Sequence, residues 1–122
     1  MRKSIANRGD VYWLDPSPTV GKEIKGMHRF VVLTTRESNQ LGIVTMVPIT
    51  SGGNFARSMG VCVHVRGGYD TVGVALCNEI YSFDLNARVK AGSAKYVETL
   101  DQSLMEEIID RVVSIIDPEE LR

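Results

Sequence analysis

The segment RGDVYWLDPSPTVGKEIKGMHRFVVLTT, residues 8–35, decides the fold because two apolar β-type runs flank a polar loop in it. The two runs predict β-strands over residues 8–15 and 29–35. The sequence DPSP at residues 15–18 ends the first strand, since proline interrupts a strand and favours a turn. Residues 16–27 are therefore expected to form a long loop, and loops between rigid strands commonly carry functional side chains.

The chain between residues 42 and 97 predicts further short strands separated by glycine-containing turns. They are expected at residues 42–49, 61–65, 72–77 and 94–97, and residues 80–83 extend or follow the 72–77 strand. Pro48 indicates an edge strand or a bulge, because proline lacks the N–H that a sheet ladder needs. A turn or short connection is expected at residues 38–40, and a single helical turn at residues 84–88.

The C-terminal segment has a different periodicity. Apolar residues recur at helical spacing from Leu104 to Ile116, which predicts one amphipathic helix of about four turns packed on the sheet. Thr99 and Asp101 are candidate N-caps, and Thr99 with Gln102 fits a capping box. Many short strands with one terminal helix predict a mainly β fold, either a small barrel or a strongly curved sheet.

The composition is that of an ordinary globular protein. The chain has 122 residues, a net charge of −1 and 43% hydrophobic residues, which predicts a single domain over residues 1–122. The sequence contains no membrane-spanning run and no signal-peptide pattern, so we expect a cytoplasmic protein. Basic residues exceed acidic ones in residues 1–36, whereas residues 98–122 are acidic, which allows a local basic face on a nearly neutral protein.

The cysteines and histidines lack the spacing of a metal site. Cys62 and Cys77 lie in apolar strand-like runs, so we expect buried free thiols, as in a reducing compartment. His64 alternates with apolar neighbours and is expected to point outward from its strand. Tyr12 and Trp13 are assigned to packing rather than to base stacking.

The loop and the start of the second strand hold three groups suited to a phosphate-directed reaction, Glu23, His28 and Arg29. Glu23 could act as a general base, Arg29 could stabilise a developing phosphorane, and His28 could protonate a departing 5′-oxygen. Attack of an RNA 2′-hydroxyl on its own phosphate needs these services and no metal. Spacing alone favours the alternative, in which the charged residues belong to a solvated loop and His28 and Arg29 simply begin a strand.

A second cluster occupies residues 50–57, TSGGNFAR. Thr50 and Ser51 offer hydroxyl groups at a strand end, and the two glycines at residues 52–53 let backbone N–H groups approach a ligand closely. Arg57 adds a cation that could bind phosphate. The alternative is an ordinary connection between strands.

A third cluster, Asn78 and Glu79, directly follows the apolar run at residues 74–77. Polar groups at the end of a strand could reach the edge of a base or line a groove. Solvation of the strand end explains them equally well.

Four segments, in this order, resemble the MazF/PemK family of toxin endoribonucleases. They are RGDVYWLDPSPTVGKE, the strand HRFVVLT, VPITSGGNFARSMG, and the GV…N…DLNAR stretch from Gly73 to Arg88. The terminal amphipathic helix also fits, so the resemblance covers nearly the whole chain. VPITSGGNFAR and DLNAR look most like the PemK and ChpB branch.

The resemblance implies an SH3-like barrel, shared with CcdB-type toxins, that works as a homodimer. It also implies a toxin of a type II toxin–antitoxin system that cleaves single-stranded RNA at short sequence sites without a metal or other cofactor. The implied products are a 2′,3′-cyclic phosphate and a 5′-hydroxyl. The implied partner is a cognate antitoxin whose disordered acidic segment occupies the RNA groove.

The resemblance also assigns residues. It implies catalytic roles for Glu23, Arg29 and Thr50. It implies RNA-binding roles for Lys22, His28, Ser51, Arg57, Asn78 and Glu79. The PemK branch carries Arg-x-Asp as acid and base after the Gly-Val strand, and here that triplet reads Leu76-Cys77-Asn78. ChpB-like sequences also have Asn there.

Two other functions remain open at this point. The first is a CcdB-like poison that binds a protein such as gyrase and cleaves nothing, and the second is a catalytically inactive RNA-binding paralogue. The charged loop argues for chemistry, whereas the Leu76 and Asn78 departures argue against it. An inactive paralogue would bind single strands with salt-dependent affinity and leave them intact.

Overall fold

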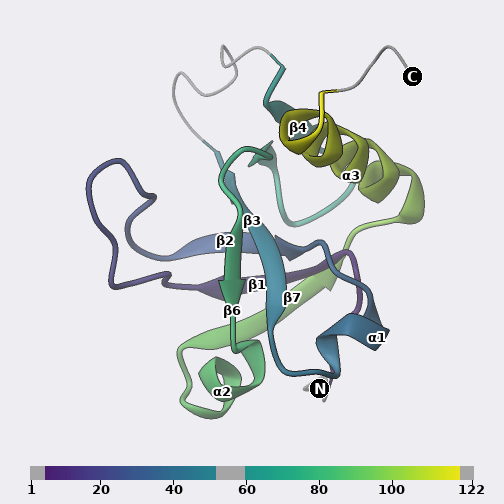
Figure 1. Ribbon diagram of the computed structural model, residues 1–122. Helices are drawn as coiled ribbons and strands as arrows, with labels where there is room; N and C mark the ends of the chain where they lie inside the picture. The colour runs from purple at the N-terminus through teal and green to yellow at the C-terminus, as the bar shows by residue number, and fades with distance from the viewer. Residues whose placement is uncertain (1–4, 52–59, 119–122) are drawn as a thin grey trace.

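The computed structural model describes residues 5–51 and 60–118, and its seven strands form one antiparallel sheet (Figure 1). The strand order is β4-β5-β3-β2-β1-β7, and β6 pairs with β3. All the predicted strands are present: β1 (Asp10–Leu14), β2 (His28–Val32), β3 (Val44–Thr50), β4 (Cys62–Val65), β5 (Gly73–Leu76), β6 (Tyr81–Phe83) and β7 (Ala94–Thr99).

Both faces of the sheet are buried, each in its own hydrophobic core. Along β1, Val11 belongs to the core under α3 (Gln102–Ile116), and the next residue, Tyr12, belongs to the core beside α2 (Leu85–Lys90). This follows from the alternation of side chains along a strand. In Figure 1, β1 and β2 run across β3 and β6. The sheet therefore curls strongly, and the predicted mainly β fold with one C-terminal helix is confirmed.

Helix α3 confirms the expected amphipathic helix. Met105, Ile108 and Val112 are buried against the sheet, and their spacing of three and four residues places them on one face. Val113 and Ile116 keep 50% and 67% of their surface exposed. The helix therefore packs through one side and leaves part of its apolar surface uncovered in the single chain.

The N-cap of α3 is Asp101, whose carboxylate accepts a hydrogen bond from the backbone nitrogen of Leu104 at 2.8 Å. The predicted capping box of Thr99 with Gln102 is wrong. Thr99 is instead the last residue of β7, paired with Asp10, and its hydroxyl donates to the Asp10 carboxylate at 2.7 Å. Strand pairing extended further than the local capping signal indicated.

Two short helices depart slightly from the expected turns. A helical turn, α1 (Arg36–Asn39), lies where a turn or short connection was predicted, and the Thr35 hydroxyl caps it by accepting from the Ser38 nitrogen. The helical turn predicted at residues 84–88 is confirmed and continues to Lys90 as α2, with Asp84 as its N-cap.

Pro48 lies in a central strand, so of the two predicted possibilities, an edge strand or a bulge, the edge strand is wrong. Strand β3 pairs with β2 along residues 46–49. On its other side it pairs with β6 through residues 44–46 and with β5 through residues 49–50. Pro48 lies between these last two ladders, at a break where the sheet requires no donor.

Some of the remaining predictions for single residues are confirmed and others are not. Cys62 and Cys77 are both free thiols, but Cys77 is buried while Cys62 is half-buried. His64 is exposed, as predicted, and Tyr12 is buried. Trp13 keeps 40% of its surface exposed, and its assignment to packing rather than to base stacking stays a prediction. No helix in residues 5–51 or 60–118 combines the length and hydropathy needed to cross a bilayer.

Candidate active site

The loop between β1 and β2, residues 15–27, projects from the sheet (Figure 1) and is tied back to it at two points. Near its start, the Arg88 guanidinium of α2 donates to the Asp15 carbonyl oxygen at 2.8 Å while lying 4.4 Å from the centroid of the Phe83 ring. Near its end, the Ile24 nitrogen donates to the Tyr81 hydroxyl at 3.2 Å. These two contacts determine where the loop presents its side chains.

Glu23 is exposed and shapes the loop from within. Its carboxylate accepts a hydrogen bond from the Val20 nitrogen at 2.7 Å, and the Glu23 nitrogen donates to the Val20 carbonyl at 3.2 Å. Lys25 donates from its ammonium group to the Gly21 carbonyl at 2.6 Å. Lys22 is exposed on the same turn. The predicted base is therefore held in place by one oxygen of its carboxylate.

The Asp15 carboxylate closes the turn at the start of the loop. It accepts from both the nitrogen and the hydroxyl of Ser17, at 2.9 and 2.6 Å. These hydrogen bonds, together with weaker attraction from Arg88 and His28, hold the pKa of Asp15 below its ordinary value. An ionised carboxylate thus lies close enough to His28 to interact with it.

His28 brings several of the predicted residues together. One ring nitrogen lies 2.9 Å from the Lys25 carbonyl oxygen. The pairing of β2 with β3 ends with Arg29 opposite Ile49, and His28 and Thr50 are the next residues along the two strands. The charge of His28 acts on the carboxyl group of Glu79, which lies between β5 and β6.

Glu79 is half-buried, and one of its carboxylate oxygens has no hydrogen-bond partner within the described ranges. Burial raises the pKa of Glu79 above its ordinary value, and this effect outweighs the attraction of His28 and a hydrogen bond from Tyr81. Burial also raises the pKa of Tyr81, with Glu79 and Glu23 adding to the effect. Glu23, His28, Glu79 and Tyr81 thus form one neighbourhood at the base of the loop.

Arg29 leaves β2 on the opposite face from His28, as adjacent strand residues do. Its guanidinium lies 5.8 Å from the centroid of the Trp13 ring, on the neighbouring strand. The Nε atom is buried and has no hydrogen-bond partner among the residues that the structure describes. No hydrogen bond in those ranges joins Arg29 to Glu23. The two predicted catalytic groups therefore reach the end of the sheet from different directions.

Thr50 ends β3, half-buried beside the start of β5, and Ser51 follows it in an exposed position. The backbone of Gly73 packs directly against Thr50, and a Cβ atom at Gly73 would collide with the Thr50 carbonyl group. Arg57 and the glycines at residues 52–53 lie outside the described residues. Asn78 is exposed next to Glu79.

The arrangement offers groups for proton transfer and for binding an anion. A carboxylate, an imidazole and a half-buried carboxyl interact at the base of the loop, and the guanidinium of Arg29, whose Nε has no partner among the described residues, lies on the other face of β2. Such a set can move protons and stabilise negative charge. Within residues 5–51 and 60–118, no group of three or more His, Cys, Asp or Glu side chains is placed to hold a metal ion.

Three contributors were missing from the sequence prediction: Trp13, Tyr81 and Arg88. Tyr81 and Arg88 act by holding the loop, and no local pattern marks a residue that contacts a distant backbone atom. Trp13 gave a weak signal, because it lies near the end of a predicted strand, just before the DPSP sequence at residues 15–18. An aromatic residue at such a place can lie beyond the core.

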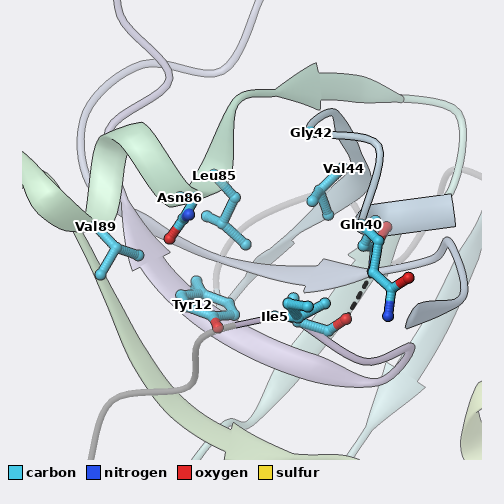
Figure 2. A pocket seen from close by; sticks show the side chains of 10 residues that line it. Ile5, Tyr12, Gln40, Gly42, Val44, Leu85, Asn86 and Val89 are labelled. Carbon is cyan, nitrogen blue, oxygen red and sulfur yellow. Dashed lines mark hydrogen bonds between the residues drawn. The ribbon is translucent and has the colours of Figure 1, made fainter. Parts of the chain in front are cut away.

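A separate hollow of about 110 Å³ lies away from this site, beside α1 and α2. Figure 2 shows its lining, which includes Ile5, Tyr12, Leu85 and Val89. The Asn39 amide donates to the Ala6 carbonyl at its rim, at 2.9 Å. The hollow is small and mostly apolar, so it extends the second core and is too small for a nucleotide.

Comparison with known proteins connects this chain to one family. Residues 7–116 match the family described as "PemK-like, MazF-like toxin of type II toxin-antitoxin system". The chain is 33% identical over 117 residues to Endoribonuclease PemK of Escherichia coli, covering 94% of this chain and 85% of that protein. It is 36% identical over 120 residues to Endoribonuclease toxin ChpB of Escherichia coli strain K12, covering 96% and 99%.

Solved structures share the fold. MazF from Deinococcus radiodurans superposes with a TM-score of 0.79 at 21% identity, covering 93% of this chain and 98% of that one. The MazE–MazF structure from the same organism gives a TM-score of 0.72 at 18% identity, covering 94% and 98%. The curled sheet with its C-terminal helix is therefore the architecture of these proteins.

Proposed function

This chain belongs to the PemK-like, MazF-like toxin family of type II toxin–antitoxin systems, and from that premise we propose that it is a sequence-specific endoribonuclease toxin acting on single-stranded RNA. The 2′-oxygen forms a bond to the adjacent phosphorus, the bond from phosphorus to the 5′-oxygen breaks, and no metal takes part. The 2′-hydroxyl loses its proton and the 5′-oxygen gains one, which leaves a 2′,3′-cyclic phosphate and a 5′-hydroxyl.

The observation that carries this proposal is the buried Nε of Arg29, which has no hydrogen-bond partner in the described part of the chain. A buried polar group without a partner is costly, and such groups cluster where a ligand completes them. A phosphate that gains charge in the transition state fits a guanidinium, because charge-assisted hydrogen bonds to phosphate are strong. Arg29 is proposed to stabilise that charge.

Proton transfer is assigned to Glu23 and His28, which belong to the group of residues at the base of the β1–β2 loop. One carboxylate oxygen of Glu23 accepts a hydrogen bond from the Val20 nitrogen. The other oxygen takes the proton of the 2′-hydroxyl or positions that group. His28 is suited to supply a proton to the 5′-oxygen, because an imidazole can act as acid or base at neutral pH. Thr50, which follows the Ile49 that pairs with Arg29, hydrogen-bonds the phosphate.

RNA binding is proposed for the polar residues around this centre. Lys22 and Ser51 are exposed, and Asn78 and Glu79 lie between β5 and β6. Arg57 belongs to the same proposal by its place in the sequence. The Arg-x-Asp acid and base of the PemK branch are replaced here by Leu76 and Asn78, and Glu79 supplies the carboxyl group nearest to that position.

The molecule is further proposed to act as a homodimeric single domain in the cytoplasm, with a cognate antitoxin that carries an acidic disordered segment. The exposed apolar residues Val113 and Ile116 on α3 support a self-association surface. The antitoxin is supported by the MazE–MazF structure, in which a protein of this fold is paired with MazE. Association is checked by the molar mass of the purified chain in solution.

The deciding experiment incubates purified protein with a long single-stranded RNA in EDTA and maps the 5′ ends of the products. Discrete cuts with 5′-hydroxyl ends, absent with Arg29→Ala, are expected. Intact RNA that is nevertheless bound would identify an inactive RNA-binding paralogue. Intact and unbound RNA would leave the CcdB-like alternative, a toxin that binds a protein such as gyrase.

A further inference from the structure

Three side chains form a row across adjacent strands at the end of the β1–β2 hairpin. Trp13 on β1 is paired with Arg29 on β2 and with Lys95 on β7. Residues directly opposite each other in an antiparallel sheet project from the same face. Arg29, Trp13 and Lys95 therefore stand side by side, with an aromatic ring between two cations.

This row is open, although the residues next to it on the same face are buried. Val11 and Val31, the next pair along β1 and β2 on that face, are fully buried in the core under α3. Trp13 is 40% exposed and Lys95 is exposed. The core thus ends at Val11 and Val31, and the row lies just beyond it.

Among the described residues, the indole has a single ring contact, which is with Arg29. The guanidinium of Arg29 lies 5.8 Å from its centroid, near the outer limit of about 6 Å for a cation–π contact. No other ring contact to Trp13 is found within the described ranges. A large apolar ring left open between cations is unexplained by folding, since burial would have been favourable.

We propose that this row is an extension of the RNA-binding surface, in which Trp13 stacks on a base next to the scissile phosphate and Lys95 binds a phosphate further along the strand. The inference rests on the proposed function, because Arg29 belongs to both. Single-stranded nucleic acid is bound by aromatic stacking platforms flanked by basic side chains. Lys95 and Arg29 stand two strand spacings apart, about 10 Å, with the ring between them.

Stacking on Trp13 is expected to fix the position of one base of the RNA without selecting strongly among the four bases. Stacking accepts every base because each has a flat π-face. Lys95 contributes affinity that depends on salt and not on sequence. The row therefore anchors the RNA beside the site. The ends of the β-strands and the turns around His28 are left to contact the edges of the bases.

The test uses the fact that Trp13 is the single tryptophan of the chain. The probes are short, fully 2′-O-methylated single-stranded RNAs that tile the transcript used for cleavage, so that no 2′-hydroxyl is available to react. Binding is followed by fluorescence anisotropy of the labelled probe and, separately, by the protein's own fluorescence. Quenching of tryptophan emission that saturates together with anisotropy is expected.

Substitutions at Trp13 and at Lys95 separate stacking from charge. Trp13→Leu is expected to weaken probe binding on the order of tenfold, and Trp13→Phe to restore much of it, because a phenyl ring still stacks. Lys95→Ala is expected to reduce the slope of log affinity against log salt by about 0.7, the effect of one phosphate contact on a single strand. Lys90→Ala, at an exposed lysine on α2, is the matched control and leaves the slope unchanged.

The outcomes distinguish this inference from the proposed function. Probe binding without tryptophan quenching, or with full affinity in Trp13→Leu, overturns the stacking role even when wild-type protein cleaves RNA. Quenching by an acidic peptide but by none of the RNAs would assign the row to a protein partner instead. A wild-type protein that neither binds the probes nor cleaves the transcript would overturn the proposed function itself.

Discussion

The hydroxyl of Tyr81, on β6, accepts a hydrogen bond from the backbone nitrogen of Ile24 at 3.2 Å, across 57 positions of sequence. This contact ties the projecting β1–β2 loop to the strand that follows Glu79. The Tyr81 hydroxyl also hydrogen-bonds the Glu79 carboxyl group, and the charge of Glu23 helps to raise the pKa of Tyr81. Tyr81 is thus a positioning residue for the loop.

Replacing Tyr81 with phenylalanine should loosen the loop and leave the sheet intact. The lost hydrogen bond is expected to cost about 0.5–1.5 kcal/mol and to speed amide hydrogen exchange at Ile24. RNA cleavage should slow, because Glu23 is no longer held in one place. Hydrogen exchange and cleavage rates measured on the same preparation check this prediction.

The control is Tyr96→Phe, which removes a tyrosine hydroxyl that lies 2.7 Å from the Thr99 hydroxyl, away from the loop. It should leave exchange at Ile24 unchanged. Equal exchange at Ile24 in wild-type protein and in Tyr81→Phe would show that the loop is held by other contacts.

Arg29→Ala should lower the rate of RNA cleavage by roughly 100- to 1,000-fold, the usual cost of removing a donor that stabilises transition-state charge. Arg29→Lys should recover little, since an ammonium group lacks the planar guanidinium fork that binds phosphate. Single-turnover cleavage measures both variants. Arg66→Ala, at an exposed arginine after β4, serves as the control. Undiminished cleavage by Arg29→Ala would remove this residue from the mechanism.

Gly73→Ala should destabilise the protein through the backbone of Thr50. Gly73 has φ +153°, and an added Cβ would collide with the Thr50 carbonyl group, which is main chain and cannot rotate away. The expected loss is about 1–3 kcal/mol, with a further fall in cleavage as Thr50 shifts. Urea unfolding measures the first effect.

Gly67, where an added Cβ atom would meet open space, provides the control for Gly73→Ala. A Cβ at Gly67 meets no atom within 4 Å, although its φ of +102° is also positive. Gly67→Ala should therefore lose stability through backbone strain alone and retain cleavage. If Gly73→Ala lowered the free energy of unfolding no more than Gly67→Ala does, the close approach of Gly73 to Thr50 would not contribute to stability.

Glu79→Gln should change the dependence of stability on pH. Burial raises the pKa of Glu79 above its ordinary value of 4.5, so the folded state holds this proton more tightly than the unfolded state. The contribution of Glu79 to stability is thus greatest below that value and declines as the pH rises through the folded pKa. The variant should lack this decline and be more stable than wild type at neutral pH.

Thermal unfolding of both proteins across the acidic and neutral range measures the effect. Glu37→Gln, at an exposed carboxylate on α1, is the control and should not remove the decline. Parallel profiles for wild type and Glu79→Gln would show that the carboxyl of Glu79 is solvated in the folded protein.

Most of the fold could be predicted from periodicity. Alternating apolar runs located every strand, and the helical spacing from Leu104 to Ile116 located α3. The errors came where a local rule competed with pairing. Thr99 is a good cap by type, but β7 continues through it to pair with Asp10. Proline is typical of an edge strand or a bulge. Pro48 is accommodated in a central strand because β6 pairs with residues 44–46 and β5 with residues 49–50, so neither strand pairs with Pro48 itself.

The candidate site was less predictable. The loop residues Glu23, His28 and Arg29 could be named from their chemistry, yet their spacing did not show that His28 and Arg29 diverge to opposite faces. The meeting of Glu79 with His28 joins turns about 50 residues apart, and no local pattern encodes such a contact. Trp13 was assigned to packing rather than to base stacking, and only the structure shows that the core of the sheet ends one pair earlier, at Val11 and Val31.

The sequence by itself determined the elements of this protein and the chemical groups it can use, because apolar periodicity, turn residues and side-chain chemistry are local properties. Tertiary structure alone decided which of those groups meet. Curvature of the sheet and the register of β1, β2 and β7 set Trp13 between Arg29 and Lys95. The hydroxyl of Tyr81 holds the loop beside Glu79. Such contacts depend on strand register and on distant backbone atoms, which are fixed only when the whole sheet closes around its cores.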